Sequence, residues 1–174
     1  MTDRLQDRFL GLSSLAMILA AIAAARLIAL FLSPSELGFD EAQYVLWAEH
    51  FDFGYFTKPP LIAWVIGAET AICGQSAACV RSIVPLLNSG TAFVLALLAA
   101  RLYGMRTGFW TGIFFAIMPG IAVSSFLITT DPFLLFFWSI GLLAILLQLE
   151  RPGLKPALLF PARPSIAHCR GRTI

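Results

Sequence analysis

Charge is scarce in this 174-residue chain, and this scarcity indicates its class. Charged residues make up 13% of the sequence and hydrophobic residues 59%, whereas a soluble domain carries about 25% charged residues. Mean hydropathy is +0.83. The 12 lysines and arginines are nearly balanced by 10 acids and are scattered along the chain, so there is no basic stripe for a nucleic-acid backbone. We therefore predict an integral membrane protein that does not bind nucleic acid.

Cysteine and histidine are also scarce. The three cysteines, Cys73, Cys79 and Cys169, show no CxxC spacing. The two histidines, His50 and His168, are far apart in the sequence. A metal site built on cysteine is therefore not expected.

Long apolar runs, in contrast, are abundant. Four stretches contain roughly the 20 helical residues that are needed to cross a hydrocarbon core of about 30 Å. They lie at about 11–32, 82–100, 107–127 and 132–149. Because lipid offers no hydrogen-bond partner to an open backbone, we expect all four to be helices. The first run is too long for the apolar part of a typical secretory signal, so we interpret it as a retained anchor.

The positive residues around these spans predict their orientation. Three pairs fall on one side of the predicted membrane: Arg4 with Arg8, Arg101 with Arg106, and Arg151 with Lys155. By the positive-inside rule this side is cytoplasmic, and the N-terminus lies there. The connection 33–81 and the sequence TTDP at 129–132 would then share the extracytoplasmic face.

Two segments do not read as spans. Residues 59–80 begin with two prolines and hold an apolar run that is too short to cross a bilayer, which predicts an interfacial or re-entrant helix. We expect one or two such helices within 33–81. Residues 151–174 contain prolines and arginines without an apolar period, which predicts a disordered cytoplasmic tail or an out-of-frame extension.

Acidic residues mark the predicted extracytoplasmic face. An acid at the bilayer centre costs about 2.5 to 3.5 kcal/mol, so acids in membrane proteins lie at interfaces or in cavities unless they act there. Asp40 and Asp131 each fall at a predicted helix boundary on this face, and Glu41 is the neighbour of Asp40. Asp131 suits a helix cap before Pro132, and the other two suit a solvated loop. A catalytic site is the alternative for all three.

Cations and aromatic rings accompany these acids. Lys58 and Arg81 lie on the side that positive residues usually avoid, either to balance nearby acids or to hold an anionic ligand such as a phosphate. Tyr55 belongs to an aromatic group that suits either an interfacial belt or stacking on a sugar. Arg26, inside the first span, is expected to have a structural partner within the bundle.

Three motifs carry a resemblance to a known family. They are DEAQYVLWA at 40–48, GYFTKPPLIAW at 54–64 and ITTDPFLLFFW at 128–138, with an arginine opening the second span. In this order the sequence resembles the N-terminal part of the polyprenyl-phosphate-dependent glycosyltransferases with the GT-C fold. It is most similar to the bacterial branch of aminoarabinose transferases, protein mannosyltransferase-like enzymes and galacturonosyltransferase-type domains. The resemblance covers roughly residues 10–150.

The resemblance implies an all-α membrane enzyme of the bacterial inner membrane, with about four transmembrane helices in this portion. Such enzymes transfer a sugar, with inversion, from a polyprenyl-phosphate carrier to lipid A, another lipid, a glycan or a protein on the periplasmic face. The implied catalytic carboxylates are Asp40, Glu41 and Asp131. Lys58 and Arg81 would bind the carrier phosphate, and Tyr55 would contact substrate. Some members use a divalent cation, and Asp40 with Asp131 are the residues that would hold one here.

Length is the departure from this family. Its members normally have many more spans, so residues 1–150 would form only the N-terminal membrane portion of the domain. We expect a truncated or frameshifted product whose pocket is incomplete and which is inactive on its own. The alternatives are a small transporter or channel subunit, in which the acids form an ion pathway, and an inactive membrane remnant.

Overall fold

The computed structural model describes residues 2–33, 35–50, 52–55 and 58–150, and these ranges contain helices and no strands. The predicted disordered or out-of-frame tail, 151–174, lies outside the described residues. The helices are α1 (Thr2–Leu32), α2 (Phe39–Glu49), α3 (Leu61–Cys73), α4 (Ala77–Val80), α5 (Ile83–Tyr103), α6 (Met105–Ile117), α7 (Pro119–Ser124) and α8 (Asp131–Glu150). The prediction of an all-α membrane fold is confirmed.

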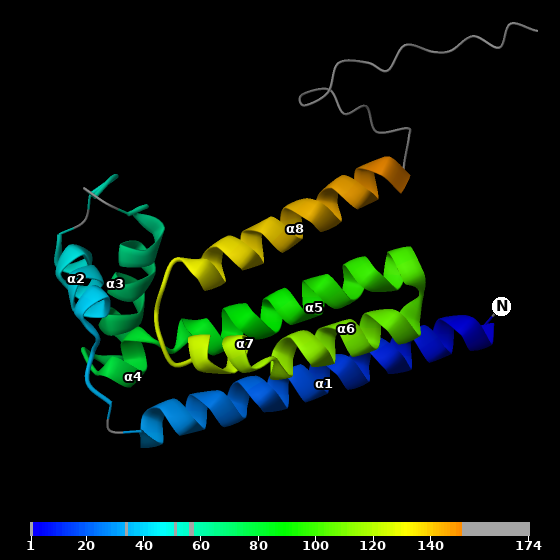
Figure 1. Cartoon of the computed structure of the whole chain (residues 1–174), viewed down its shortest axis with the longest axis horizontal. Helices are drawn as coiled ribbons and strands as arrows, with labels where there is room; N and C mark the ends of the chain where they lie inside the picture. The colour runs from blue at the N-terminus through cyan, green and yellow to red at the C-terminus, as the bar shows by residue number, and fades with distance from the viewer. Residues whose placement is uncertain (1, 34, 51, 56–57, 151–174) are drawn as a thin grey trace, which may run out of the picture.

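Long helices form a bundle, and short helices gather at one of its ends (Figure 1). The helices α1, α5, α6 and α8 run side by side, and α2, α3 and α4 sit together beyond them. By length and composition, three segments of the described chain can cross a membrane: Gly11–Leu32, Ala77–Tyr103 and Asp131–Glu150. They correspond to three of the four predicted spans.

The remaining predicted span, 107–127, is divided into two helices. Helix α6 ends at Ile117, Met118 is extended with φ −55° and ψ 131°, and α7 starts at Pro119. Proline has no backbone N–H and disfavours the helical conformation in the residue before it. The proline therefore explains both the extended Met118 and the new start.

Close packing of α5 against α6 depends on small residues. A Cβ on Gly108 would lie 2.5 Å from the Ala100 Cβ and 2.5 Å from the Ala96 carbonyl oxygen. Gly112 likewise lies against Ala96, where an added Cβ would stand 3.0 Å from the alanine Cβ. The backbones approach this closely because the α6 face lacks side chains, as in small-xxx-small contacts between membrane helices.

The short helices are held to the bundle by a separate apolar core. Its buried members are Tyr44, Ile62, Ile66, Val80, Val84, Ile128 and Phe133. They come from α2 through α5, from the loop before α8 and from α8 itself. Helix α3 begins at Leu61, directly after the two prolines as predicted, and ends at Cys73. The residue that follows it, Gly74, has a φ of 86°, which suits glycine. This core fixes where the polar residues of the same end lie.

Candidate functional site

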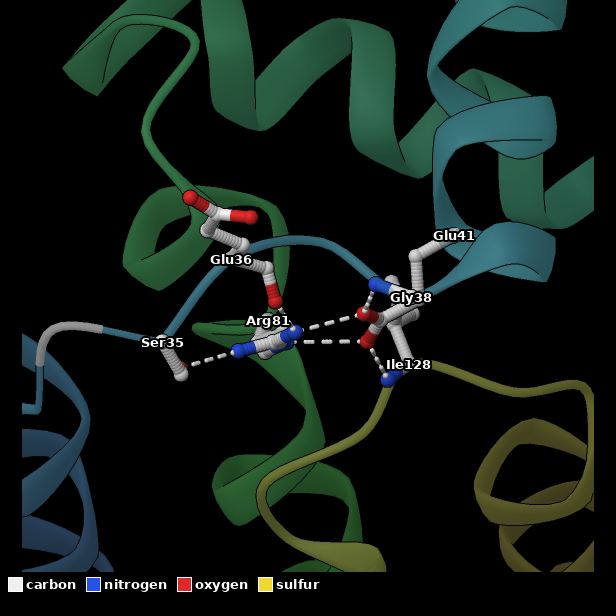
Figure 2. Close-up of polar contacts among 6 residues, drawn as sticks. All are labelled: Ser35, Glu36, Gly38, Glu41, Arg81 and Ile128. Atoms are coloured by element: carbon white, nitrogen blue, oxygen red, sulfur yellow. Dashed lines mark hydrogen bonds and ion pairs between the residues drawn. The ribbon is translucent and has the colours of Figure 1, made fainter.

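Glu41 is the centre of the polar network at the α2 end of the bundle (Figure 2). Its side chain turns back to accept a hydrogen bond from the Gly38 N–H at 2.7 Å, closing a capping box at the start of α2. The Arg81 Nε donates to Oε1 at 2.8 Å, and the Arg81 Nη2 donates to Oε2 at 2.5 Å. The Ile128 N–H donates to Oε1 at 2.9 Å. Four donors therefore saturate a carboxylate that is only 3% exposed.

Arg81 is equally committed within this network. It is 3% exposed, and besides its two contacts with Glu41 it donates to the Ser35 hydroxyl at 2.6 Å and to the Glu36 carbonyl at 2.8 Å. The planar guanidinium suits this fork of acceptors, which a lysine would not match. Arg81 thus joins α1's exit loop, the start of α2 and the start of α5.

The network controls the charge state of Glu41. Burial alone would raise the pKa of this carboxyl, but hydrogen bonds from Arg81, Gly38 and Ile128, with the charge of Arg81, outweigh burial. The net result is a pKa below its ordinary value. Glu41 is therefore held as a carboxylate, with no lone pair left for a substrate.

Asp40 and Asp131 occupy matching positions at the starts of two helices. Asp40 lies in the first turn of α2 and Asp131 opens α8, and both side chains are exposed. The bond between Ile128 and Glu41 joins the loop before α8 to the first turn of α2. The structure thus brings the neighbourhoods of the two aspartates together and leaves both carboxylates accessible. A carboxylate at a helix N-terminus is also stabilised by the helix dipole.

Lys58 and Tyr55 lie in the connection between α2 and α3 and differ in their engagement. Lys58 is half-buried and forms no ion pair with any described residue. The Tyr55 hydroxyl lies 2.8 Å from the Trp47 carbonyl and 2.7 Å from the His50 carbonyl, and its ring stacks on Trp47 at 5.0 Å. Tyr55 is therefore built into the loop, whereas the Lys58 ammonium is free of ionic partners among these residues.

Two features of this end were not predicted. A disulfide joins Cys73 at the end of α3 to Cys79 in α4. Next to it, the Ser82 hydroxyl donates to Glu69 Oε1 at 2.6 Å, while Glu69 Oε2 is buried without a partner in the described structure. Burial raises the pKa of the Glu69 carboxyl, against the opposing hydrogen bonds from Ser82 and Ile83. The six-residue spacing of the cysteines, with a glycine between them, was the available signal for the disulfide.

A divalent cation fits this arrangement only in part. Asp40 and Asp131 offer hard oxygen ligands, but within the described ranges no three His, Cys, Asp or Glu side chains are grouped to hold a metal ion. Calcium takes six to eight oxygen ligands, and magnesium an octahedral shell that keeps several waters. We therefore derive no chemical step through a metal.

Two surface hollows of the described structure lie away from these residues. The larger, about 680 Å³ and open, runs along α6 past Arg106, Trp110 and Phe114. A smaller one, about 360 Å³, is lined by residues that include the exposed ion pair of Arg101 with Glu150. Neither hollow is lined by Asp40, Glu41 or Asp131.

Comparison with known proteins assigns the sequence to a group of enzymes. Residues 57–161 match the family described as dolichyl-phosphate-mannose-protein mannosyltransferase. The chain is also similar to lipid A galacturonosyltransferase RgtD of Rhizobium johnstonii, with 40% identity over 134 residues. That match covers 76% of this chain and 28% of the relative. No solved structure matches.

Proposed function

Because the chain belongs to the dolichyl-phosphate-mannose-protein mannosyltransferase family, and so to the membrane glycosyltransferases with the GT-C fold, we propose that it supplies part of a site for sugar transfer from a polyprenyl phosphate. The acceptor is a lipid such as lipid A, a glycan or a protein. The chain spans 28% of the length of its curated relative. The observation that carries the proposal is the placement of two exposed aspartates, Asp40 at the start of α2 and Asp131 at the start of α8. The hydrogen bond from Ile128 to Glu41 links these two helix starts.

The site belongs, in this proposal, to the periplasmic face of a bacterial inner membrane. Two observations support this orientation. The Cys73–Cys79 disulfide lies at the end of the bundle that carries the site, and disulfides persist in oxidising compartments. Arg101 and Arg106 flank the α5–α6 turn at the opposite end, as expected for the cytoplasmic side.

The chemistry assigns different tasks to the cation and the acid. Lys58 stabilises the negative charge that builds on the carrier phosphate as the bond between the anomeric carbon and the phosphate oxygen breaks. The acceptor oxygen attacks the anomeric carbon from the opposite face, so the configuration inverts. Asp40 takes the proton from an acceptor hydroxyl, a contribution of typically about 10² to 10⁴ in rate. Asp131 orients the acceptor or the sugar from the start of α8.

Glu41, Arg81 and Tyr55 have supporting tasks in this proposal. The Glu41 carboxylate and the Arg81 guanidinium are saturated by each other and by neighbouring groups, so they position the first turn of α2. Arg81 attracts the carrier phosphate by its positive charge and forms no hydrogen bond with it. The Tyr55 ring keeps the connection that bears Lys58 against α2. This division departs from a purely catalytic assignment of Glu41 because its lone pairs are occupied.

A chimera tests the function. The matching segment of the Rhizobium relative is replaced by that of this chain, and transfer is measured in membranes that contain a polyprenyl-phosphate sugar and lipid A. We expect Asp40→Asn to lower kcat by about 100-fold or more, because the general base is lost. The amount of inserted protein should not change.

Glu49→Gln is the matched control for this experiment. Glu49 lies at the other end of the same helix and is exposed, so its loss should leave kcat within about twofold of the parent chimera. An active chimera that keeps its full rate with Asp40→Asn would remove Asp40 from the chemistry. Equal losses in both variants would show that α2 matters only as a folded element.

A further inference from the structure

The Cys73–Cys79 disulfide lies immediately before the arginine that organises the site. Cys79 is fully buried and stands two residues before Arg81. Its backbone N–H is capped by the Ser76 hydroxyl at 3.2 Å, so the start of α4 is fixed by a side chain as well as by the disulfide. The covalent link therefore holds the short turn of chain that carries Arg81.

A second bridge lies on the other side of Arg81. The Ser82 hydroxyl donates to Glu69 of α3 at 2.6 Å, while the disulfide ties α4 to the last residue of the same helix. Both bridges thus run from α3 to the chain on either side of Arg81. An arginine with four acceptor atoms, two in the connection after α1 and two in α2, needs such a fixed backbone, because a small shift would break several short hydrogen bonds at once.

From these contacts we propose that oxidation of Cys73 and Cys79 is the step that assembles the site, by fixing Arg81 where it binds Glu41 and so setting the first turn of α2. Glu41 passes the constraint on, since it also receives the Gly38 and Ile128 N–H groups. The cysteines are positioning residues with no contact to substrate. Their value for sugar transfer rests on the proposed function, whereas the oxidation and its effect on α2 do not.

The redox step is thiol–disulfide exchange with an oxidised dithiol protein of the extracytoplasmic compartment. The two cysteine thiols lose two protons and two electrons as their S–S bond forms. The disulfide of the partner protein is cleaved, takes up the two electrons and two protons, and becomes two thiols. A chain that stays in a reducing compartment would keep both thiols and lack the constraint.

Thiol counting tests the oxidation. The full chain, with Cys169→Ser to leave only this pair, is expressed in a bacterial inner membrane, quenched in acid, denatured and treated with a maleimide that adds measurable mass. We expect no maleimide on the untreated protein and two after prior reduction. Two maleimides without reduction would overturn the proposal.

Hydrogen exchange of the intact chain tests the positioning. After mild reduction, amide exchange should become roughly tenfold faster at residues 38–42 and at Ile128, where no covalent link to the cysteines exists. Residues 92–100, inside α5, serve as the internal reference and should be unchanged. Exchange that stays the same at 38–42 and Ile128, or that rises equally in 92–100, would overturn the positioning role.

The paired variant Cys73→Ser with Cys79→Ser should reproduce the pattern of the reduced protein. Should this variant fail to insert, reduction of the already folded chain still gives the answer. Because neither measurement uses sugar transfer, the proposal fails or stands independently of the glycosyltransferase assay. A normal exchange response with an inactive chimera would discard the proposed function alone.

Discussion

Asp40 and Glu41 are adjacent in the first turn of α2, but their side chains lie in different surroundings. Successive residues of a helix point about 100° apart, so one faces outward when the other faces the bundle. Asp40 is exposed, and Glu41 is 3% exposed against Arg81. The sequence marked the pair as a candidate site but could not assign the two roles. The deciding partner, Arg81, is 40 residues away and leaves no local pattern.

The two perturbed glutamates predict opposite responses to pH. The lowered pKa of Glu41 contributes stability that is fully present above about 4.5, its ordinary value, and lost as pH falls through the folded pKa. The raised pKa of Glu69 contributes stability that is fully present below about 4.5 and lost as pH rises through the folded pKa. The free energy of unfolding in detergent, measured from pH 3 to 8, should therefore fall towards both the acid and the alkaline end of this range.

Amide variants separate these two effects. Glu41→Gln should remove the loss on the acid side, and at neutral pH it should be less stable than the parent because Arg81 stays buried without its anionic partner. Glu69→Gln should remove the loss on the alkaline side, since the amide oxygen still accepts from Ser82. If the Glu41→Gln variant still lost stability on the acid side, another group would be the cause of that loss.

At the scale of the elements, the interruption after α6 explains an arginine inside the membrane. The Ala116 carbonyl would normally accept from the N–H four residues later, but the chain is extended at Met118. Arg26 of α1 donates to this carbonyl instead, at 2.5 Å. The sequence indicated a structural partner for Arg26 without identifying it, because the carbonyl becomes available only where Pro119 ends the helix.

Replacing this arginine should loosen α6 from α1. Arg26→Leu is expected to cost about 1 to 3 kcal/mol of unfolding free energy, the usual effect of leaving a buried polar group unpaired. Arg26→Lys should recover part of the loss, because an ammonium still donates. Arg106→Leu, an exposed arginine at the other end of α6, is the control and should change little. Equal losses for the Arg26 and Arg106 changes would contradict the capping role.

The α5–α6 contact was missed although its signal is present in the sequence. Gly108, Gly112 and Ala116 recur every four residues in α6, opposite alanines with the same spacing in α5. Gly108→Ala is expected to destabilise the bundle by about 1 to 3 kcal/mol, because the new Cβ meets backbone that cannot move away. Gly141→Ala, where a Cβ meets nothing within 4 Å, should be neutral or slightly stabilising. Detergent unfolding of both variants checks this, and equal behaviour would contradict the close approach.

At the scale of the whole molecule, the sequence predicted what depends on local composition. Apolar runs located three of the four predicted spans, prolines located the start of α3, and motif order gave the enzyme family. The sequence offered nearby acids as one kind of partner for Arg81 and a partner within the bundle for Arg26, but it identified neither Glu41 nor the Ala116 carbonyl. Such pairs form because the bundle brings helix ends together, and that geometry has no trace in any single stretch of sequence.

Orientation in the membrane is the prediction on which the placement of the whole site depends. In a chain with Cys169→Ser, Glu49→Cys at the exposed end of α2 should react with an impermeant maleimide applied to the periplasmic side of intact cells. Thr107→Cys, exposed at the start of α6, should react only after the membrane is permeabilised. The reason is that arginines flank the turn before α6, whereas a disulfide lies beside α2. Reversed labelling would place the aspartates and the disulfide in the cytoplasm, where neither a periplasmic acceptor nor thiol oxidation would be available to them.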